Sequence, residues 1–167
     1  MSMLEVKDLV VSYGAIKALK GISFSVEQGE VITLIGSNGA GKTTTLHSIS
    51  NLIKKESGSI LFEGEDITNL SADKIVNRGL IQVPEGRRVF ANMSVRENIE
   101  MGAYLRKDKE QIKKDMEWCY ELFPRLKERL SQMSGTLSGG EQQMLAMARA
   151  LAYIAESAKK YGIFTLL

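Results

Sequence analysis

The sequence predicts an α/β fold that opens with an antiparallel β region and continues into a helical subdomain. Apolar and polar residues alternate over 4–12 and again over 21–26, the pattern of half-buried strands. Residues 31–35 are apolar on both faces, as in a central strand of a parallel sheet, and they lead into a glycine-rich loop and a helix. Residues 93–130 are charged and helical in pattern, which predicts the subdomain.

The elements between the loop and the subdomain alternate between helix and strand. Residues 43–53 carry apolar side chains at helical spacing and predict a helix, and residues 59–62 predict a strand. Residues 71–78 predict a short helix closed by a glycine, and 80–83 a buried strand that stops at Pro84. This alternation is typical of α/β proteins.

The subdomain begins with a helix-start signal. Ser94 followed by Glu97 three residues later predicts a capping box. Further along, charges of both signs interleave, which indicates a solvated helix face rather than a binding patch. These residues are Lys107, Asp108, Lys109, Glu110, Lys113, Lys114, Asp115 and Glu117.

Composition excludes several classes of protein. Of the 167 residues, 44% are hydrophobic and 25% charged, which is ordinary for a globular protein and suits one domain with a subdomain. A net charge of +2 gives no support for nucleic acid as the main partner. Glu5 and Lys7 interrupt any signal-peptide core, and no run approaches the roughly 20 apolar residues that span a bilayer. The single cysteine excludes an internal disulfide and fits a reducing compartment.

The glycine-rich loop matches the phosphate-binding P-loop pattern and stands between a predicted strand and a helix N-terminus. Its glycines let backbone N–H groups point inward, and the helix dipole adds positive potential. Lys42 is expected to reach the terminal phosphates, and the hydroxyl of Thr43 to bind Mg²⁺. The loop residues are Gly36, Ser37, Asn38, Gly39, Ala40, Gly41, Lys42, Thr43 and Thr44. The loop alone does not separate kinases, GTPases and transporter ATPases.

A second candidate anion site lies in the C-terminal third of the sequence. Ser138 is a predicted N-cap with Glu141 three residues later, and the intervening glycines let N–H groups approach a phosphate. A plain capped helix is the alternative for this segment taken alone. The segment consists of Leu137, Ser138, Gly139, Gly140 and Glu141. With the residues that follow, it closely resembles the signature motif of ABC ATPases.

The resemblance covers residues 3–152, with the pieces in the family's order. It implies a P-loop NTPase-like ABC ATPase core that binds ATP and Mg²⁺. It also implies that the signature segment faces the P-loop of a second ATP-binding subunit, so that ATP is sandwiched between two chains. Tyr13 matches the aromatic residue that stacks on adenine, although a lone strand tyrosine is more often part of a core. The implied partners are membrane-embedded permease subunits, contacted by residues 93–130 at the cytoplasmic face of the cell membrane.

Residues 82–90 occupy the place of the family's Q-loop, but Glu85 stands where glutamine is usual. A carboxylate can still bind Mg²⁺ or its water, so Glu85 joins Thr43 as a candidate metal ligand. Arg87 and Arg88 either contact nucleotide or partner, or belong to a solvated loop. The sequence of residues 84–90 resembles that of ATP-binding subunits of branched-chain amino acid importers. This resemblance implies that the transported cargo is a branched-chain amino acid.

The resemblance ends after Ala152, so the ABC ATPase core is expected to be incomplete at the C-terminus. The family continues into an apolar strand ending in Asp and Glu, and later a switch histidine. Here Glu156 is the last acidic residue, and the only histidine is His47. The missing groups hold the metal and position the attacking water, so these residues alone are expected to hydrolyse ATP poorly. A frameshift, a split gene and a truncation all fit, and residues 163–167 could supply a substitute strand.

The expected domains are an ATP-binding core over 1–92, a helical subdomain over 93–136, the signature motif and helix over 137–152 and a divergent tail over 153–167. The leading hypothesis is an ATP-binding subunit of an importer. The alternative is a truncated remnant that binds nucleotide or a partner without turnover. A soluble ABC protein of DNA repair or translation is disfavoured by the short helical segment and the near-neutral charge.

Overall fold

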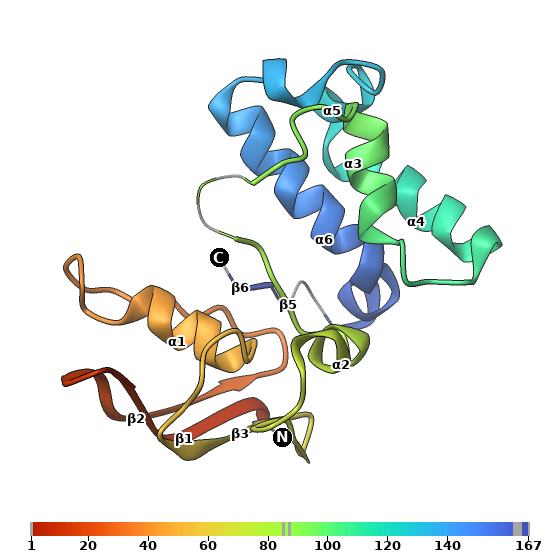
Figure 1. Ribbon diagram of the computed structural model, residues 1–167. Coiled ribbons are helices and arrows are strands. Elements are labelled where there is room, and N and C mark those ends of the chain that lie inside the picture. The colour runs from red at the N-terminus through yellow and green to blue at the C-terminus, as the bar shows by residue number, and fades with distance from the viewer. Residues whose placement is uncertain (1, 85, 87, 162–164, 167) are drawn as a thin grey trace. The chain divides into compact units, whose positions relative to one another are not determined.

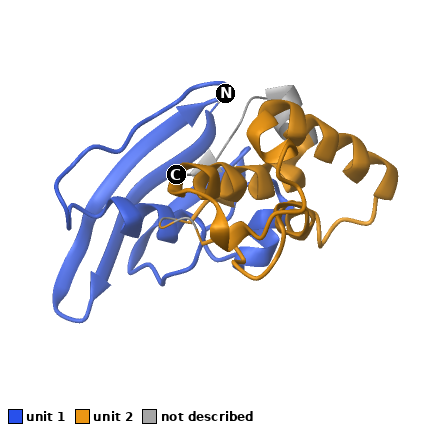
Figure 2. Cartoon of the chain, turned by 90° about the horizontal axis from the view of Figure 1, so that it is seen from above, with its two compact units in different colours: residues 1–80 blue, residues 81–167 orange. Residues whose placement is uncertain are grey.

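The computed structural model describes residues 2–84, 86, 88–161 and 165–166. The chain forms two compact units, Met1–Leu80 and Ile81–Leu167, coloured separately in Figure 2. Strands dominate the first unit and helices the second (Figure 1). This is the mixed architecture that the sequence predicts.

The first unit contains a four-stranded antiparallel sheet in the order β2-β1-β3-β4. Its strands are β1 (Ser2–Tyr13), β2 (Ile16–Glu27), β3 (Ser57–Phe62) and β4 (Glu65–Asp66). A two-residue turn joins β1 to β2, and its Gly14 has a φ of 59°, the left-handed conformation that such tight hairpins favour. The antiparallel β region predicted from alternation is confirmed.

Residues 31–35 are not a strand, contrary to the prediction. Val31 and Ile35 are each 90% exposed, and Ile32 and Leu34 are also exposed. A strand exists only through ladder hydrogen bonds to a neighbour, and β1–β4 pair among themselves. Among the residues described in this unit, none supplies a ladder to residues 31–35. The apolar composition of these residues predicts a strand only where a neighbouring strand is available to pair with it.

Helix α1 (Lys42–Ile49) follows the glycine-rich loop and is shorter than the predicted 43–53. It ends because Asn51 adopts a φ of 52°, while Leu52 N–H donates to His47 O at 2.8 Å. This is the Schellman termination, in which asparagine replaces the usual glycine. Leu52 is 58% exposed and so contributes little to the core that its spacing suggested.

Two short elements follow β4. Helix α2 (Ala72–Asn77) lies within the predicted 71–78, with Ser71 at its N-cap, and the predicted Gly79 follows it with a φ of 91°. Strand β5 (Ile81–Gln82) is shorter than the predicted 80–83 and pairs in parallel with β6 (Thr165–Leu166). The tail therefore supplies a strand, but it pairs with β5 and not with residues 31–35, where a substitute for the family's strand was expected to lie. Residues 163, 164 and 167 of the expected segment lie outside the described part of the chain.

The second unit is built on the long helix α6 (Gly139–Tyr161), which packs against α3 (Val95–Gly102) and α4 (Lys109–Leu122). Helix α5 (Pro124–Lys127) and a 3₁₀ turn, η1 (Ser134–Thr136), lead from α4 to α6. A Cβ at Gly102 would lie 1.9 Å from Arg149 O, so only glycine permits this approach of α3 to α6. α6 is interrupted at Ile154, close to where the family resemblance ends.

The predicted capping box of α3 is present in full. Glu97 N–H donates to Ser94 Oγ at 3.2 Å, and Ser94 N–H donates to Glu97 Oε2 at 2.7 Å. These bonds satisfy two N–H groups that the helix itself leaves unpaired. Hydrogen bonds to the Glu97 carboxylate from the Ser94 hydroxyl, at 2.7 Å, and from the Ser94 backbone N–H lower the pKa of Glu97. The helical segment predicted from this signal thus begins with α3, whereas the second compact unit begins earlier, at Ile81.

Asp115 corrects the prediction of a solvated charged face on α4. The side chain is fully buried, and its Oδ2 lies 2.8 Å from Arg106 Nη2. Gln111 Nε2 donates to its other oxygen at 3.0 Å, and Arg106 also donates to Ala152 O at 2.8 Å. A buried carboxylate needs such partners, and Arg106 supplies a charge from nine residues earlier. The seven other charged residues in the predicted set are exposed.

None of the helices in the described residues is long and apolar enough to cross a membrane.

Candidate functional site

The first candidate site is the N-terminus of α1, which receives no hydrogen bond from a side-chain cap. Its N-cap residue is Gly41, and its first turn holds no acidic residue. The first N–H groups of a helix have no partner within the helix, and together they carry about half a positive charge. The start of α1 can therefore receive an anion that a capping side chain would otherwise displace.

Lys42 adds a formal positive charge to this helix start. Its Nζ donates to Gly36 O at 2.8 Å and to Ser37 O at 3.0 Å, so the side chain folds back over the loop. A lysine ammonium has three donors, and two are engaged with loop carbonyls. The loop also closes on itself through Ala40 N–H to Ser37 O at 3.1 Å. Lys42 thus holds the shape of the loop and places its charge there.

The loop shape requires glycine at particular positions. Gly39 and Gly41 have φ values of 84° and 91°, where other residues are strained. A Cβ at Gly41 would also lie 2.6 Å from Leu19 Cδ2 and 3.1 Å from Ala18 O, both in β2. At Gly36 a Cβ would lie 2.8 Å from the Cβ of Ala40. The backbone therefore follows a path that a chain with side chains at these positions would not take.

Thr43 and Thr44 follow Lys42 in the first turn of α1, Thr43 exposed and Thr44 half-buried. A threonine at an exposed position in the first turn has the chemistry to bind Mg²⁺, which takes one or two protein oxygen ligands and completes its shell with phosphates and waters. Glu85, the other predicted metal ligand, lies outside the described residues. Within the described ranges, three or more His, Cys, Asp or Glu side chains do not cluster as a metal site would require.

Tyr13 lies at the end of β1, opposite Ile16 across the hairpin, and it is 50% exposed. It is therefore not a core tyrosine. Ala18 of β2 contacts the loop at Gly41, and Ile16 is two residues away along the same strand, a distance of about 7 Å. Tyr13 therefore lies at the end of the hairpin whose second strand approaches the glycine-rich loop at Ala18, and its ring is exposed, as stacking on a base would require.

The second candidate site is the N-terminus of α6. Leu137 is buried and anchors the chain just before it. Glu141 N–H donates to Ser138 Oγ at 3.4 Å, which is the predicted cap. Ser138 N–H and Oγ–H in turn donate to Glu141 Oε2, at 2.9 and 2.8 Å. Gly139 is the first helical residue, and a Cβ at Gly140 would meet no atom within 4 Å. Packing within the chain does not require glycine at 140, whereas close approach of an outside group would.

The predicted Q-loop segment is attached to α6. Arg149 donates from Nη2 to Arg88 O at 2.9 Å, and its guanidinium lies 4.9 Å from the centre of the Phe90 ring. Burial lowers the pKa of Arg149. Arg88 therefore contributes its backbone carbonyl to α6, while Arg87 lies outside the described residues. The sequence analysis did not single out Arg149, because its partners lie about sixty residues earlier in the chain.

Asn98 also escaped the sequence analysis, although it organises the end of this segment. It is fully buried and accepts from Phe90 N–H at 2.9 Å. Its amide donates to Phe90 O, Ser94 O and Ser134 Oγ at 3.0–3.1 Å. One side chain thereby links α3, the loop before it and the turn that precedes the signature segment. Its place on the inward face of an amphipathic helix was the available signal.

Comparison with known proteins matches residues 19–156 to the family model described as ABC transporter. The chain is 48% identical over 149 residues to the high-affinity branched-chain amino acid transport ATP-binding protein BraG of Pseudomonas aeruginosa. It is 36% identical over 149 residues to the probable branched-chain amino acid transport ATP-binding protein LivF of Archaeoglobus fulgidus. Each match covers 89% of this chain, and 64% and 63% of those proteins. The chain thus spans just under two thirds of their length.

The name of a third relative gives a different transported substrate. The molybdate/tungstate import ATP-binding protein WtpC of Thermococcus kodakarensis is 42% identical over 135 residues, covering 80% of this chain and 40% of that protein. Among solved structures, a nucleotide-free ATP-binding cassette from an ABC transporter matches with a TM-score of 0.79 at 29% identity. That match covers 92% of this chain and 66% of the other. A cassette in its ADP conformation also matches at 0.79, with 28% identity, over 92% and 65%.

The two left-handed glycines of the loop give a stability prediction with an internal control. Gly39→Ala adds backbone strain alone and should lower the free energy of unfolding by about 1 kcal/mol. Gly41→Ala adds a collision with β2 to the same strain, so its cost should be larger, about 2–4 kcal/mol. Chemical denaturation measures both. Equal losses in the two variants would show that the close approach of Gly41 to β2 is absent in solution.

Proposed function

Because the chain belongs to the ABC transporter family, we propose that it is an ATP-binding subunit that holds Mg-ATP on the loop from Gly36 to Thr44. The observation that carries this proposal is the start of α1, where the positive end of a helix without a side-chain cap meets the ammonium of Lys42. Thr43 would supply a hydroxyl ligand to Mg²⁺, and Tyr13 an exposed face for the adenine. Magnesium held there would supply positive charge to offset that of the phosphates.

The signature segment supplies the second half of the proposed ATP site. Ser138 to Gly140 would bind the terminal phosphate of a nucleotide held on the P-loop of a second ATP-binding subunit. The free space around Gly140 supports this role, since it leaves room for an outside group. Sequence likeness to the family's signature supports it independently. Two chains would then enclose ATP between them.

We propose that the transport cargo is a branched-chain amino acid. The names of the Pseudomonas and Archaeoglobus relatives support this assignment. The resemblance of residues 84–90 to ATP-binding subunits of branched-chain amino acid importers supports it as well. The permease would contact the helical subdomain at the cytoplasmic face of the membrane. Met101, Tyr104 and Leu105 support such contact, because they are exposed apolar or aromatic side chains at and just after the end of α3.

Removal of the Lys42 charge tests the phosphate site. Lys42→Ala should lower Mg-ATP affinity by at least about tenfold, because the ammonium is the formal positive charge that the loop contributes. Calorimetric titration measures the affinity. Lys54→Ala is the matched control, since Lys54 is exposed beyond the end of α1. Unchanged affinity in Lys42→Ala, or an equal loss in Lys54→Ala, would place the phosphate site elsewhere.

A second candidate function is nucleotide binding without turnover. It is favoured by the residues after Ala152, where Glu156 is the last acidic residue and histidine does not occur. The groups that position the attacking water in the family would then be missing from these 167 residues, and Lys42 and Thr43 would bind phosphate without completing the reaction.

Steady hydrolysis by the purified 167-residue chain should therefore not exceed background. The measurement is phosphate release from Mg-ATP, compared between the unchanged chain and Lys42→Ala. The two should be indistinguishable. Release that follows the protein through purification and disappears in Lys42→Ala would favour the hydrolysing subunit instead, and Glu85 would be the first residue to test as a substitute base.

A further inference from the structure

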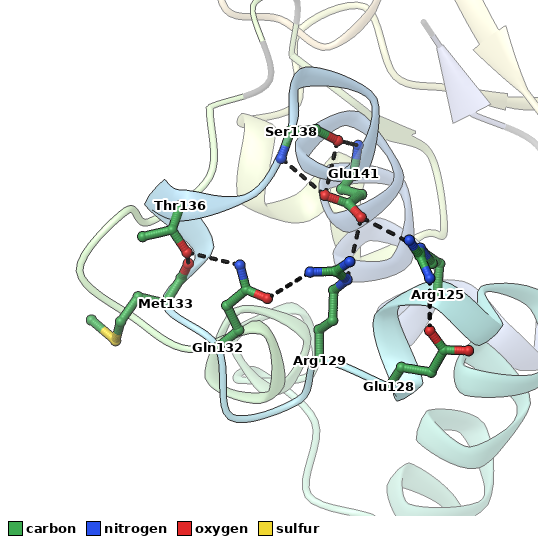
Figure 3. A network of polar contacts seen from close by, with 8 residues as sticks. All are labelled: Arg125, Glu128, Arg129, Gln132, Met133, Thr136, Ser138 and Glu141. Atoms are coloured by element: carbon green, nitrogen blue, oxygen red, sulfur yellow. Dashed lines mark hydrogen bonds and ion pairs between the residues drawn. The ribbon is translucent and has the colours of Figure 1, made fainter.

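Glu141 connects the signature segment to a group of arginines. One carboxylate oxygen, Oε2, accepts both hydrogen bonds from Ser138. The other, Oε1, lies 3.3 Å from Arg129 Nε and 3.6 Å from Arg125 Nε (Figure 3). The carboxylate therefore lies between the residue that caps α6 and two cations from α5 and the turn after it.

This position of Glu141 creates an electrostatic conflict. A helix N-terminus attracts anions, and the proposed ligand of this one is a phosphate. Glu141 is itself an anion in the first turn of α6, and hydrogen bonds from the Ser138 backbone and hydroxyl lower its pKa. The carboxylate is therefore charged at neutral pH and would repel a phosphate arriving at Ser138. A nearby positive charge is needed to offset it.

Arg129 is held in place to provide that charge. Its Nη1 donates to Gln132 Oε1 at 3.0 Å, and Gln132 Nε2 donates to Thr136 Oγ1 at 2.9 Å. Thr136 in turn donates to Met133 O at 2.7 Å, so the series ends on the backbone (Figure 3). The Nε of Arg129 is buried and not aligned for a hydrogen bond with Glu141, so the attraction between them is that of an ion pair.

Arg125 is the second cation and is less firmly held. Its side chain is 58% exposed, against 31% for Arg129, and its Nη1 also pairs with Glu128 at 3.0 Å. The negative charge of Glu128 thereby offsets part of the attraction between Arg125 and Glu141. Exposed ion pairs contribute little, and Arg129 should have the larger effect of the two.

We propose that Arg129, supported by Arg125, is a positioning residue of the signature segment. By offsetting the charge of Glu141 and fixing its carboxylate, Arg129 keeps Ser138 oriented and lets the start of α6 accept the terminal phosphate of a nucleoside triphosphate bound to a second copy of the chain. This inference rests on the proposed function of the signature segment. Arg129 acts through Glu141 and does not itself touch the phosphate.

A double-mutant cycle tests the inference through ATP-dependent dimer formation. The ATP concentration at which the chain dimerises, with Mg²⁺ present, is measured by light scattering during size-exclusion chromatography. In a chain that retains Glu141, Arg129→Gln should raise this ATP concentration by about tenfold. Glu141→Gln keeps an oxygen for Ser138 but removes the charge, so adding Arg129→Gln to it should have an effect of about twofold or less.

Two further variants separate positioning from folding. Arg129→Lys keeps the positive charge and should restore most of the ATP response, even if Arg129→Gln lowers the melting temperature. Lys127→Gln is the matched control, because Lys127 is an exposed cation of α5 that pairs with Glu117 at 3.6 Å and not with Glu141. It should leave the ATP response unchanged.

The outcomes distinguish the inference from the function on which it rests. If the unchanged chain does not dimerise with ATP, the proposed sandwich is wrong and the inference fails with it. If the chain dimerises but Arg129→Gln has no effect, the inference alone is overturned. The inference alone is also overturned if Arg129→Gln has the same effect in the Glu141→Gln variant as in a chain that retains Glu141. Failure of Arg129→Lys to restore the response would also overturn it, since the charge would then not be the relevant property.

Discussion

The organisation of the molecule depends on how the first N–H groups of its helices are satisfied. At α3 and α6 a serine and a glutamate form a cap, through Ser94 with Glu97 and Ser138 with Glu141. At α1 the N-cap is Gly41, which has no side chain to offer. N–H groups at a helix start need a partner, and at α1, where glycine offers no side chain and Lys42 adds a positive charge, an external anion can supply one.

The same physical requirement explains the differences between the two candidate sites. The α1 site offers a helix start without a side-chain cap, a lysine and glycines that β2 and the loop leave no room to replace. The α6 site is already occupied by its own carboxylate, and it can receive a phosphate only if the carboxylate charge is offset. This requirement gives the half-buried Arg129 a role in the site although it lies outside the signature segment. Both sites lie at helix starts, but only α6 depends on distant side chains.

The sequence predicted features whose cause is local. The capping box at Ser94 and the glycine-rich loop depend on residues within about eight positions of each other, so their patterns can be recognised in the sequence alone. Features that depend on distant partners were missed or wrongly predicted. Residues 31–35 lack the neighbour that would make them a strand, and Asp115 is buried because Arg106 reaches it. Asn98 binds a turn 36 residues away. Periodicity places such residues on a face but does not identify their partners.

The central claim is that the start of α1 binds the phosphates of a nucleotide. Amide hydrogen exchange of residues 37–44, followed with Mg-ATP and separately with adenosine, tests it most directly. Bound phosphates would accept hydrogen bonds from these N–H groups, so ATP should slow their exchange, whereas adenosine, which has no phosphate, should not. Slowed exchange confined to other segments, or equal protection by adenosine, would contradict the claim.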